Sequence, residues 1–166
     1  MSRPGLALVL SGVQLPAGSR SRGRSDKLRP FFTPMLRISR GDYEAMLGQL
    51  LAARPLEGCG LLAGSAGRVR RVYPVANRLA SPVAYELAPA QLVAAMFDLE
   101  DRGWELLAIY HSHPAGPETP SPADVAQAAY PEALLVVVSL ADPGRPVARA
   151  FRVGDRQAEE VALRIE

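Results

Sequence analysis

WELLAIYHSHPAGPETPSPAD, residues 104–124, joins an apolar run to the only two histidines of the chain and then to a proline-rich loop. Alternate residues of a β-strand point to the same face, so His111 and His113 can reach one cation if Trp104–His113 is a strand. Asp124 is the natural third ligand, because the loop can fold back and the helix that follows presents it. A catalytic zinc ion typically has three protein ligands and one open position. This stretch therefore predicts a strand, a loop and a helix built around a zinc site.

Each part of this pattern also has a simpler interpretation. Two histidines that flank a serine can be exposed loop residues, and Ser121 with Asp124 fits an ordinary helix start, with Ser at the N-cap and an acid at N3. Glu57 can be a surface charge before a strand, and Cys59 is more often a small buried hydrophobe than a nucleophile. Taken together, the spacing of these groups favours a functional site over unrelated features.

The sequence on either side of this stretch predicts a domain of mixed secondary structure. Ser39 and Asp42 are spaced like a helix-capping box, and apolar residues recur at helical spacing as far as Leu51. Pro89 opens a second helix, which Gly103 stops. Helices interleaved with strands indicate an α/β or α+β fold around one sheet. Short apolar runs predict the strands, at residues 58–65, 69–75, 83–87, 104–113, 134–140 and 147–153.

Five positions with one rigid internal spacing resemble the JAMM motif of the MPN+ zinc metalloproteases. These positions are Glu57 and the array His111-x-His113-Pro114-x6-Ser121-x2-Asp124. The resemblance extends over about residues 36–153. It implies a single curved mixed β-sheet flanked by helices, the MPN/JAMM domain with its cytidine-deaminase-like architecture.

The resemblance also implies a role for each matching residue. His111, His113 and Asp124 would bind Zn2+, and Glu57 would serve as general base and general acid. Ser121 would donate a hydrogen bond to the developing oxyanion. Because Ser121 also fits an N-cap, we expect its side chain to favour the active site over the cap. Zinc acidifies water and polarises carbonyls, so these roles suit amide hydrolysis.

Members of this family cut amide or isopeptide bonds after the C-terminal Gly-Gly of ubiquitin or a ubiquitin-like protein. The chain looks most like the minimal bacterial type, which acts on ubiquitin-like sulfur-carrier proteins. The resemblance therefore implies a metallo-isopeptidase for such a carrier. A bound peptide tail needs an extended groove, and we expect it to bind by strand addition along an exposed sheet edge. A hydrolase specific for carrier–cysteine adducts in cysteine biosynthesis is one alternative. A non-catalytic MPN scaffold is another, although scaffolds of this type normally lack the metal ligands.

Composition sets limits on the function. The 166 residues, of which 48% are hydrophobic, suit one globular domain, which we expect to cover residues 35–166. No apolar run approaches the ~20 residues of a membrane span, so no membrane role is expected. Cys59, the only cysteine, excludes an internal disulfide and favours the reducing cytoplasm. The number of subunits is left open, and a homodimer is possible.

Charge is concentrated in residues 1–34, which carry a net +5 against −3 for the remainder. The acidic remainder weakens a nucleic-acid-binding interpretation of the whole protein. Residues 1–34 lack periodicity and favour a disordered basic tail. An arm for an acidic partner and a true translation start at Met35 are the alternatives.

Overall fold

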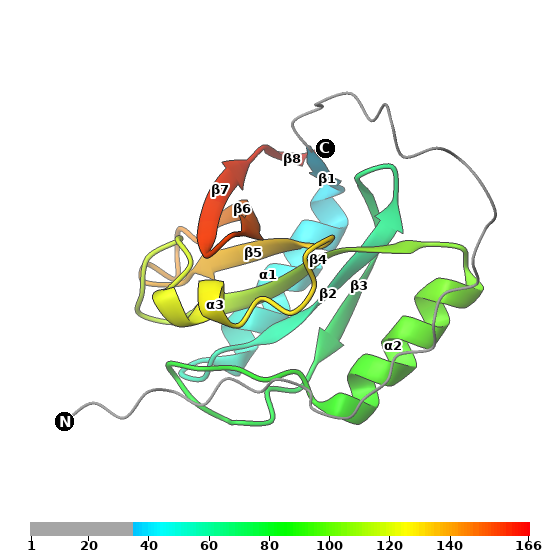
Figure 1. Ribbon diagram of the computed structural model, residues 1–166. Helices are drawn as coiled ribbons and strands as arrows, with labels where there is room; N and C mark the ends of the chain where they lie inside the picture. Colours follow the sequence, from blue (N-terminus) through cyan, green and yellow to red (C-terminus); the bar gives the residue numbers. More distant parts are fainter. Residues whose placement is uncertain (1–34) are drawn as a thin grey trace.

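The computed structural model describes residues 35–166, whose strands form one eight-stranded mixed sheet (Figure 1). The predictions made for residues 1–34 lie outside the described residues. Across the sheet the strand order is β7-β6-β5-β4-β2-β3-β1-β8. Along the chain the elements are β1 (Leu36–Ile38), α1 (Arg40–Ala53), β2 (Cys59–Ser65), β3 (Arg68–Val75), α2 (Pro89–Asp101), β4 (Glu105–His113), α3 (Pro122–Ala126), β5 (Leu134–Ser139), β6 (Val147–Gly154), β7 (Gln157–Val161) and β8 (Leu163–Ile165).

The sheet is strongly curved, as its connections require. Strands β7 and β8 lie at opposite edges of the strand order, yet only Ala162 separates them along the chain. One residue spans a few ångströms at most, so the sheet must curl until its two edges meet. Figure 1 shows β7 leading directly into β8 at this closure. The predicted fold class, a single curved mixed sheet flanked by helices, is confirmed.

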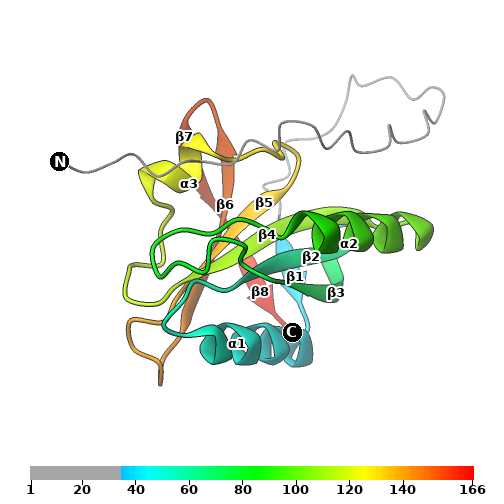
Figure 2. The same cartoon turned by 90° about the horizontal axis from the view of Figure 1, so that it is seen from below.

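The two long helices cover opposite faces of the sheet (Figure 2). Alternate strand residues pack on each side: Leu62 and Tyr110 belong to the cluster that includes α1, whereas Leu61 packs with α2. Because helices cover both faces, β2 is buried along almost its whole length. Side chains of β4 alternate between the two faces of the sheet, and Ile109 packs in the cluster on the α2 face. His111 and His113 lie two and four residues further along β4, so their side chains are on the same face.

Both predicted long helices are confirmed, and their ends match the predicted signals. The Ser39 side chain caps α1 by accepting a hydrogen bond from the Asp42 backbone N–H, 3.1 Å away. Pro89 begins α2, and Gly103 follows its end with a φ of +69°, a backbone conformation that favours glycine. No helix within residues 35–166 combines the length and apolarity that a membrane crossing requires.

One strand prediction is wrong, and three strands were not predicted. Residues 83–87 form no strand; their one ladder contact is an isolated bridge between Asn77 and Leu87. Glu86 donates its backbone N–H to the Asn77 side chain instead of to a neighbouring strand, so a ladder cannot extend there. Strands β1, β7 and β8 are short edge or near-edge elements, and β7 is mostly exposed, so they lack an apolar run.

Candidate metal centre

His111 and His113 lie at the C-terminal end of β4, in the middle of the sheet. Strand β5 runs parallel to β4 on one side and β2 runs antiparallel on the other. His111 is fully buried and His113 is 8% exposed. The alternative of exposed loop histidines is therefore wrong, because flanking strands and the loop after β4 enclose both rings.

Asp124 reaches the same point from α3. The loop after β4 turns back, and Ser121 and Asp124 cap the helix reciprocally. Asp124 Oδ2 accepts a hydrogen bond from the Ser121 backbone N–H at 2.8 Å and lies 3.2 Å from Nε2 of each histidine. The expected folding back of the proline-rich loop is confirmed.

The geometry of these three side chains suits one shared cation. His111 Nε2 and His113 Nε2 are 3.0 Å apart, and both are 3.2 Å from Asp124 Oδ2. Tetrahedral ligands about 2.0–2.1 Å from zinc lie roughly 3.4 Å apart, close to these separations. Two imidazoles and one carboxylate are also the donor types that zinc accepts. Among the described residues, these three form the one group of at least three His, Cys, Asp or Glu side chains with this arrangement.

The ring of His113 is held in the tautomer that metal binding needs. Its Nδ1 lies 2.7 Å from the Pro117 carbonyl oxygen, which can only accept, so Nδ1 must carry the proton. The lone pair of Nε2 then points at the site, the arrangement that metal-binding histidines with an outer hydrogen bond have. His111 is oriented differently: its Nδ1 is buried without a partner in residues 35–166, and the Tyr85 ring stacks on it.

Glu57 precedes β2 and lies beside the histidines. Cys59 pairs with His111, so the antiparallel register, extended by two residues, brings Glu57 opposite His113. Glu57 is 5% exposed, and its Oε2 is buried with no hydrogen-bond partner among the described residues. The alternative of a surface charge is therefore wrong.

The surroundings of the site shift the pKa values of its two carboxyl groups in opposite directions. Burial, opposed by His113 and assisted by Asp124, raises the pKa of Glu57 to about 7. Burial would also raise the pKa of Asp124, but the close contacts of its carboxylate with the His111 and His113 rings hold it well below its usual range. Asp124 is thus charged at neutral pH whereas Glu57 can exchange a proton there, a difference that suits acid–base catalysis.

Ser121 does not behave as expected. Its Oγ accepts a hydrogen bond from the Asp124 backbone N–H at 3.1 Å, so the side chain caps α3 instead of leaving the cap for the active site. The two roles are compatible, because the cap uses a lone pair of the hydroxyl and leaves its proton free to donate.

Cys59 and Ser112 are buried beside the site. Burial, then the charge of Glu57, raises the pKa of the Cys59 thiol to about 12, which keeps it protonated. It is the small buried hydrophobe of the simpler interpretation. Ser112 lies fully buried between the histidines, and its Oγ accepts a hydrogen bond from the Gly58 backbone N–H at 2.9 Å.

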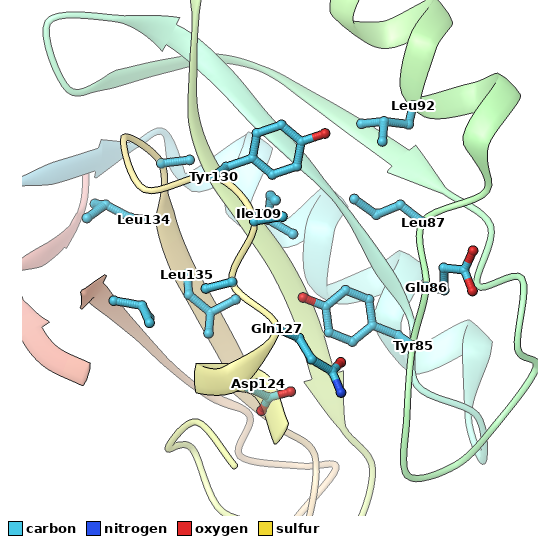
Figure 3. Close-up of a pocket in the computed structure, with 14 residues that line it drawn as sticks. Tyr85, Glu86, Leu87, Leu92, Ile109, Asp124, Gln127, Tyr130, Leu134 and Leu135 are labelled. Atoms are coloured by element: carbon cyan, nitrogen blue, oxygen red, sulfur yellow. The ribbon is translucent and has the colours of Figure 1, made fainter. Parts of the chain in front are cut away.

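A groove leads away from Asp124 between α3 and the segment that precedes α2. Figure 3 shows Tyr85 between the two walls, with Asp124 at one end of the groove and Tyr130 toward the other. Burial, reinforced by the charge of Asp124, raises the pKa of Tyr85, so its hydroxyl keeps its proton. Sequence reasoning missed Tyr85 and the other wall residues because their spacing matches no motif. The lining includes Glu86, Leu87, Ile109, Gln127, Leu134 and Leu135.

Comparisons of this sequence with known proteins all point to the same family. Residues 39–154 match the family described as prokaryotic homologs of the JAB domain. The chain is 41% identical over 130 residues to a probable TtuB-protein conjugate cleaving protease of Thermus thermophilus, covering 78% of this chain and 82% of that protein. It is 35% identical over 123 residues to a CysO-cysteine peptidase of Mycobacterium tuberculosis, covering 73% of this chain and 84% of that one.

Solved structures agree with these relatives. The solution structure of protein DSY2949 from Desulfitobacterium hafniense is similar with a TM-score of 0.73 and 33% identity, covering 80% of this chain and 93% of that one. A structure described as JAMM, a metalloprotease-like zinc site in the proteasome and signalosome, has the same fold. Its TM-score is 0.52 at 20% identity, covering 80% of this chain and 98% of that one.

Proposed function

The chain belongs to the prokaryotic homologues of the JAB domain, and from that premise we propose that it cleaves after the C-terminal Gly-Gly of a ubiquitin-like or sulfur-carrier protein. It is a protease of the JAMM type, with residues 35–166 proposed as its catalytic domain. The observation that carries the proposal is the meeting of His111, His113 and Asp124 beside the buried Glu57, with Asp124 also lining the groove.

The cofactor proposed for this site is zinc, held by His111 Nε2, His113 Nε2 and Asp124 Oδ2. The fit rests on their mutual distances and on the unpartnered Oε2 of Glu57 nearby, which lacks a hydrogen-bond donor among the described residues. When bound, zinc supplies a Lewis acid that lowers the pKa of water to about 7 and polarises the scissile carbonyl.

The protein's own residues supply the rest of the chemistry. Glu57, with a pKa of about 7, accepts a proton from the attacking water and returns it to the leaving amine. Ser121 donates its free hydroxyl proton to the oxyanion while its lone pair caps α3. Burial of both histidines keeps bulk water from the reacting atoms.

The groove suits an extended chain terminus. One side of the extended segment 84–88 is hydrogen-bonded to the backbone of residues 76–78. Glu86 O accepts from Arg78 N at 2.8 Å, and Ala88 N donates to Ala76 O at 3.0 Å. The peptide groups of Tyr85 and Leu87 alternate with these and form no hydrogen bond within residues 35–166. A carrier tail that lies along this segment can pair with them by strand addition. Glycine at its end lets the backbone pass closely over the site, since it has no Cβ.

The experiment is a comparison of carrier adducts that differ only at the scissile end. A carrier ending in Gly-Gly, joined to cysteine or to a lysine side chain, is incubated with the zinc-loaded protein and the products are weighed by mass spectrometry. We expect cleavage after Gly-Gly in both adducts. The same carriers ending in Ala-Ala, and a short free peptide with Gly-Gly, should have a much lower kcat/KM.

The outcomes separate the candidate reactions. Equal kcat/KM for all substrates would refute a carrier hydrolase and leave a general zinc peptidase. Cleavage of the cysteine adduct alone would restrict the activity to cysteine release, the reaction named for the mycobacterial relative. Cleavage of the lysine adduct supports the conjugate cleavage named for the Thermus relative.

A further inference from the structure

Asn77, the only asparagine of the chain, uses its whole carboxamide for hydrogen bonds. Its Nδ2 donates to the carbonyl oxygens of Glu57 and Ala84, each at 3.0 Å. Its Oδ1 accepts from the backbone N–H groups of Leu79 and Glu86, each at 3.1 Å. Two donors and two acceptor positions are all that a primary amide offers, so its capacity is filled.

Three of these hydrogen bonds, those to Glu57, Ala84 and Glu86, join two parts of the site that the sheet does not connect. One part is the backbone of Glu57, which also donates its N–H to the Ser81 carbonyl at 2.9 Å. The other is the extended segment 84–88, which carries Tyr85 over the His111 ring with centroids 4.3 Å apart. Asn77 therefore touches the base and the groove wall at the same time.

We infer that Asn77 is a positioning residue that sets the Glu57 carboxylate against the metal ligands and holds the groove wall in register with it. This inference rests on the proposed function. A buried carboxylate with an unpartnered oxygen has few other restraints, so its place depends on its backbone. Displacement of a catalytic group by about 1 Å can cost about 10²-fold in rate.

Two neighbouring side chains make the inference testable, because Arg78 contacts only the groove wall and Gln91 contacts neither part. Arg78 holds the segment through a paired contact with Glu86, Nε to Oε1 and Nη2 to Oε2, each at 2.6 Å, and does not touch Glu57. Gln91 accepts from the Ala76 backbone N–H at 2.7 Å, next to Asn77 in the chain, and touches neither part.

The variants Asn77→Ala, Arg78→Met and Gln91→Ala are compared with the wild type for zinc content, kcat and KM on the Gly-Gly carrier adduct. Asn77→Ala should keep zinc, lower kcat about 10- to 100-fold and raise KM. Arg78→Met should raise KM and leave kcat near its wild-type value, and Gln91→Ala should change neither. A kcat for Asn77→Ala within about twofold of the wild type would overturn the inference, as would an equal loss in Gln91→Ala.

Asn77→Asp serves as a second variant if Asn77→Ala does not fold, since it keeps both acceptor contacts and loses both donors; the same loss of kcat is expected. Amide hydrogen exchange separates failure of this inference from failure of the proposed function. If the wild type cleaves no carrier, faster exchange of the Glu57 and Glu86 amides in Asn77→Ala, or of the Glu57 amide in Asn77→Asp, still supports this positioning role. Unchanged exchange at both positions would overturn it.

Discussion

The Tyr85 ring lies nearly parallel to the His111 imidazole, with ring centroids 4.3 Å apart and planes 20° apart. His111 is fully buried and its Nδ1 has no hydrogen-bond partner in residues 35–166, so this stacking takes the orienting role that the Pro117 carbonyl has for His113. A loosely held ligand ring has a higher entropy cost when it binds a cation.

Tyr85→Leu should therefore weaken zinc binding by about 10-fold, a typical loss when a group that orients a metal ligand is removed. Tyr85→Phe keeps the ring and should bind zinc like the wild type. Competition with a chromophoric chelator measures both affinities. An equal weakening in the two variants would show that the hydroxyl, and not the stacked ring, supports His111.

Zinc should bind at about one ion per chain through His111, His113 and Asp124. Elemental analysis after gentle purification should show this stoichiometry, and the double variant His111→Ala/His113→Ala should lose it. Glu118→Gln is the matched control, because Glu118 lies on the same loop and contacts Arg149 at 3.5 Å on the surface. Full zinc occupancy in the double histidine variant would contradict this assignment.

Glu57→Gln should fold and bind zinc but lose about 10²–10⁴-fold in kcat, because an amide cannot accept the proton of the attacking water. Zinc content and kcat on the Gly-Gly adduct are measured on the same preparation. Cleavage at nearly the wild-type rate would make Glu57 a structural residue and assign the base to another group.

The same substitution should stabilise the metal-free protein in a pH-dependent way. Folding raises the pKa of Glu57 from 4.5 to about 7, so the folded state binds its proton more tightly than the unfolded state. Below pH 4.5 both states are protonated and Glu57→Gln should be neutral. As pH rises to 7 the wild type loses stability, and above pH 7 the variant should be more stable by up to about 3 kcal/mol.

Urea unfolding of chelator-treated wild type and Glu57→Gln at pH 4.5 and pH 8 checks this difference. A gain in unfolding free energy of the same size at both pH values would contradict it, since desolvation of the ionised carboxylate would then not be its cause.

Ser121→Ala should lower kcat by about 10²-fold with zinc content unchanged, through loss of an oxyanion donor. It also removes a helix cap, which costs about 1 kcal/mol. Ser39→Ala removes an equivalent cap of the same 3.1 Å length from α1, away from the metal site. It should lower stability to a similar extent and leave kcat unchanged. Similar kcat losses in both variants would assign the effect of Ser121 to capping alone.

The local sequence pattern determined much of the secondary structure of this protein. The helices α1 and α2, their capping residues and the strand that carries His111 and His113 follow from periodicity and end signals, which act over a few residues. The motif spacing also marked all five candidate site residues. The strand predicted at 83–87 failed because its pattern indicates an extended backbone but not whether a partner strand lies beside it.

Tertiary structure alone decided how these parts meet. Glu57 lies 54 residues before His111 in the numbering, and only the antiparallel register of β2 on β4 brings them together. The hydrogen bonds of Asn77, the stacking of Tyr85 and the raised pKa of Glu57 depend on the same long-range packing. Sequence spacing specifies which groups a strand or helix presents, because backbone geometry is local. Burial, and with it acidity and orientation, depends on what the rest of the fold packs against those groups.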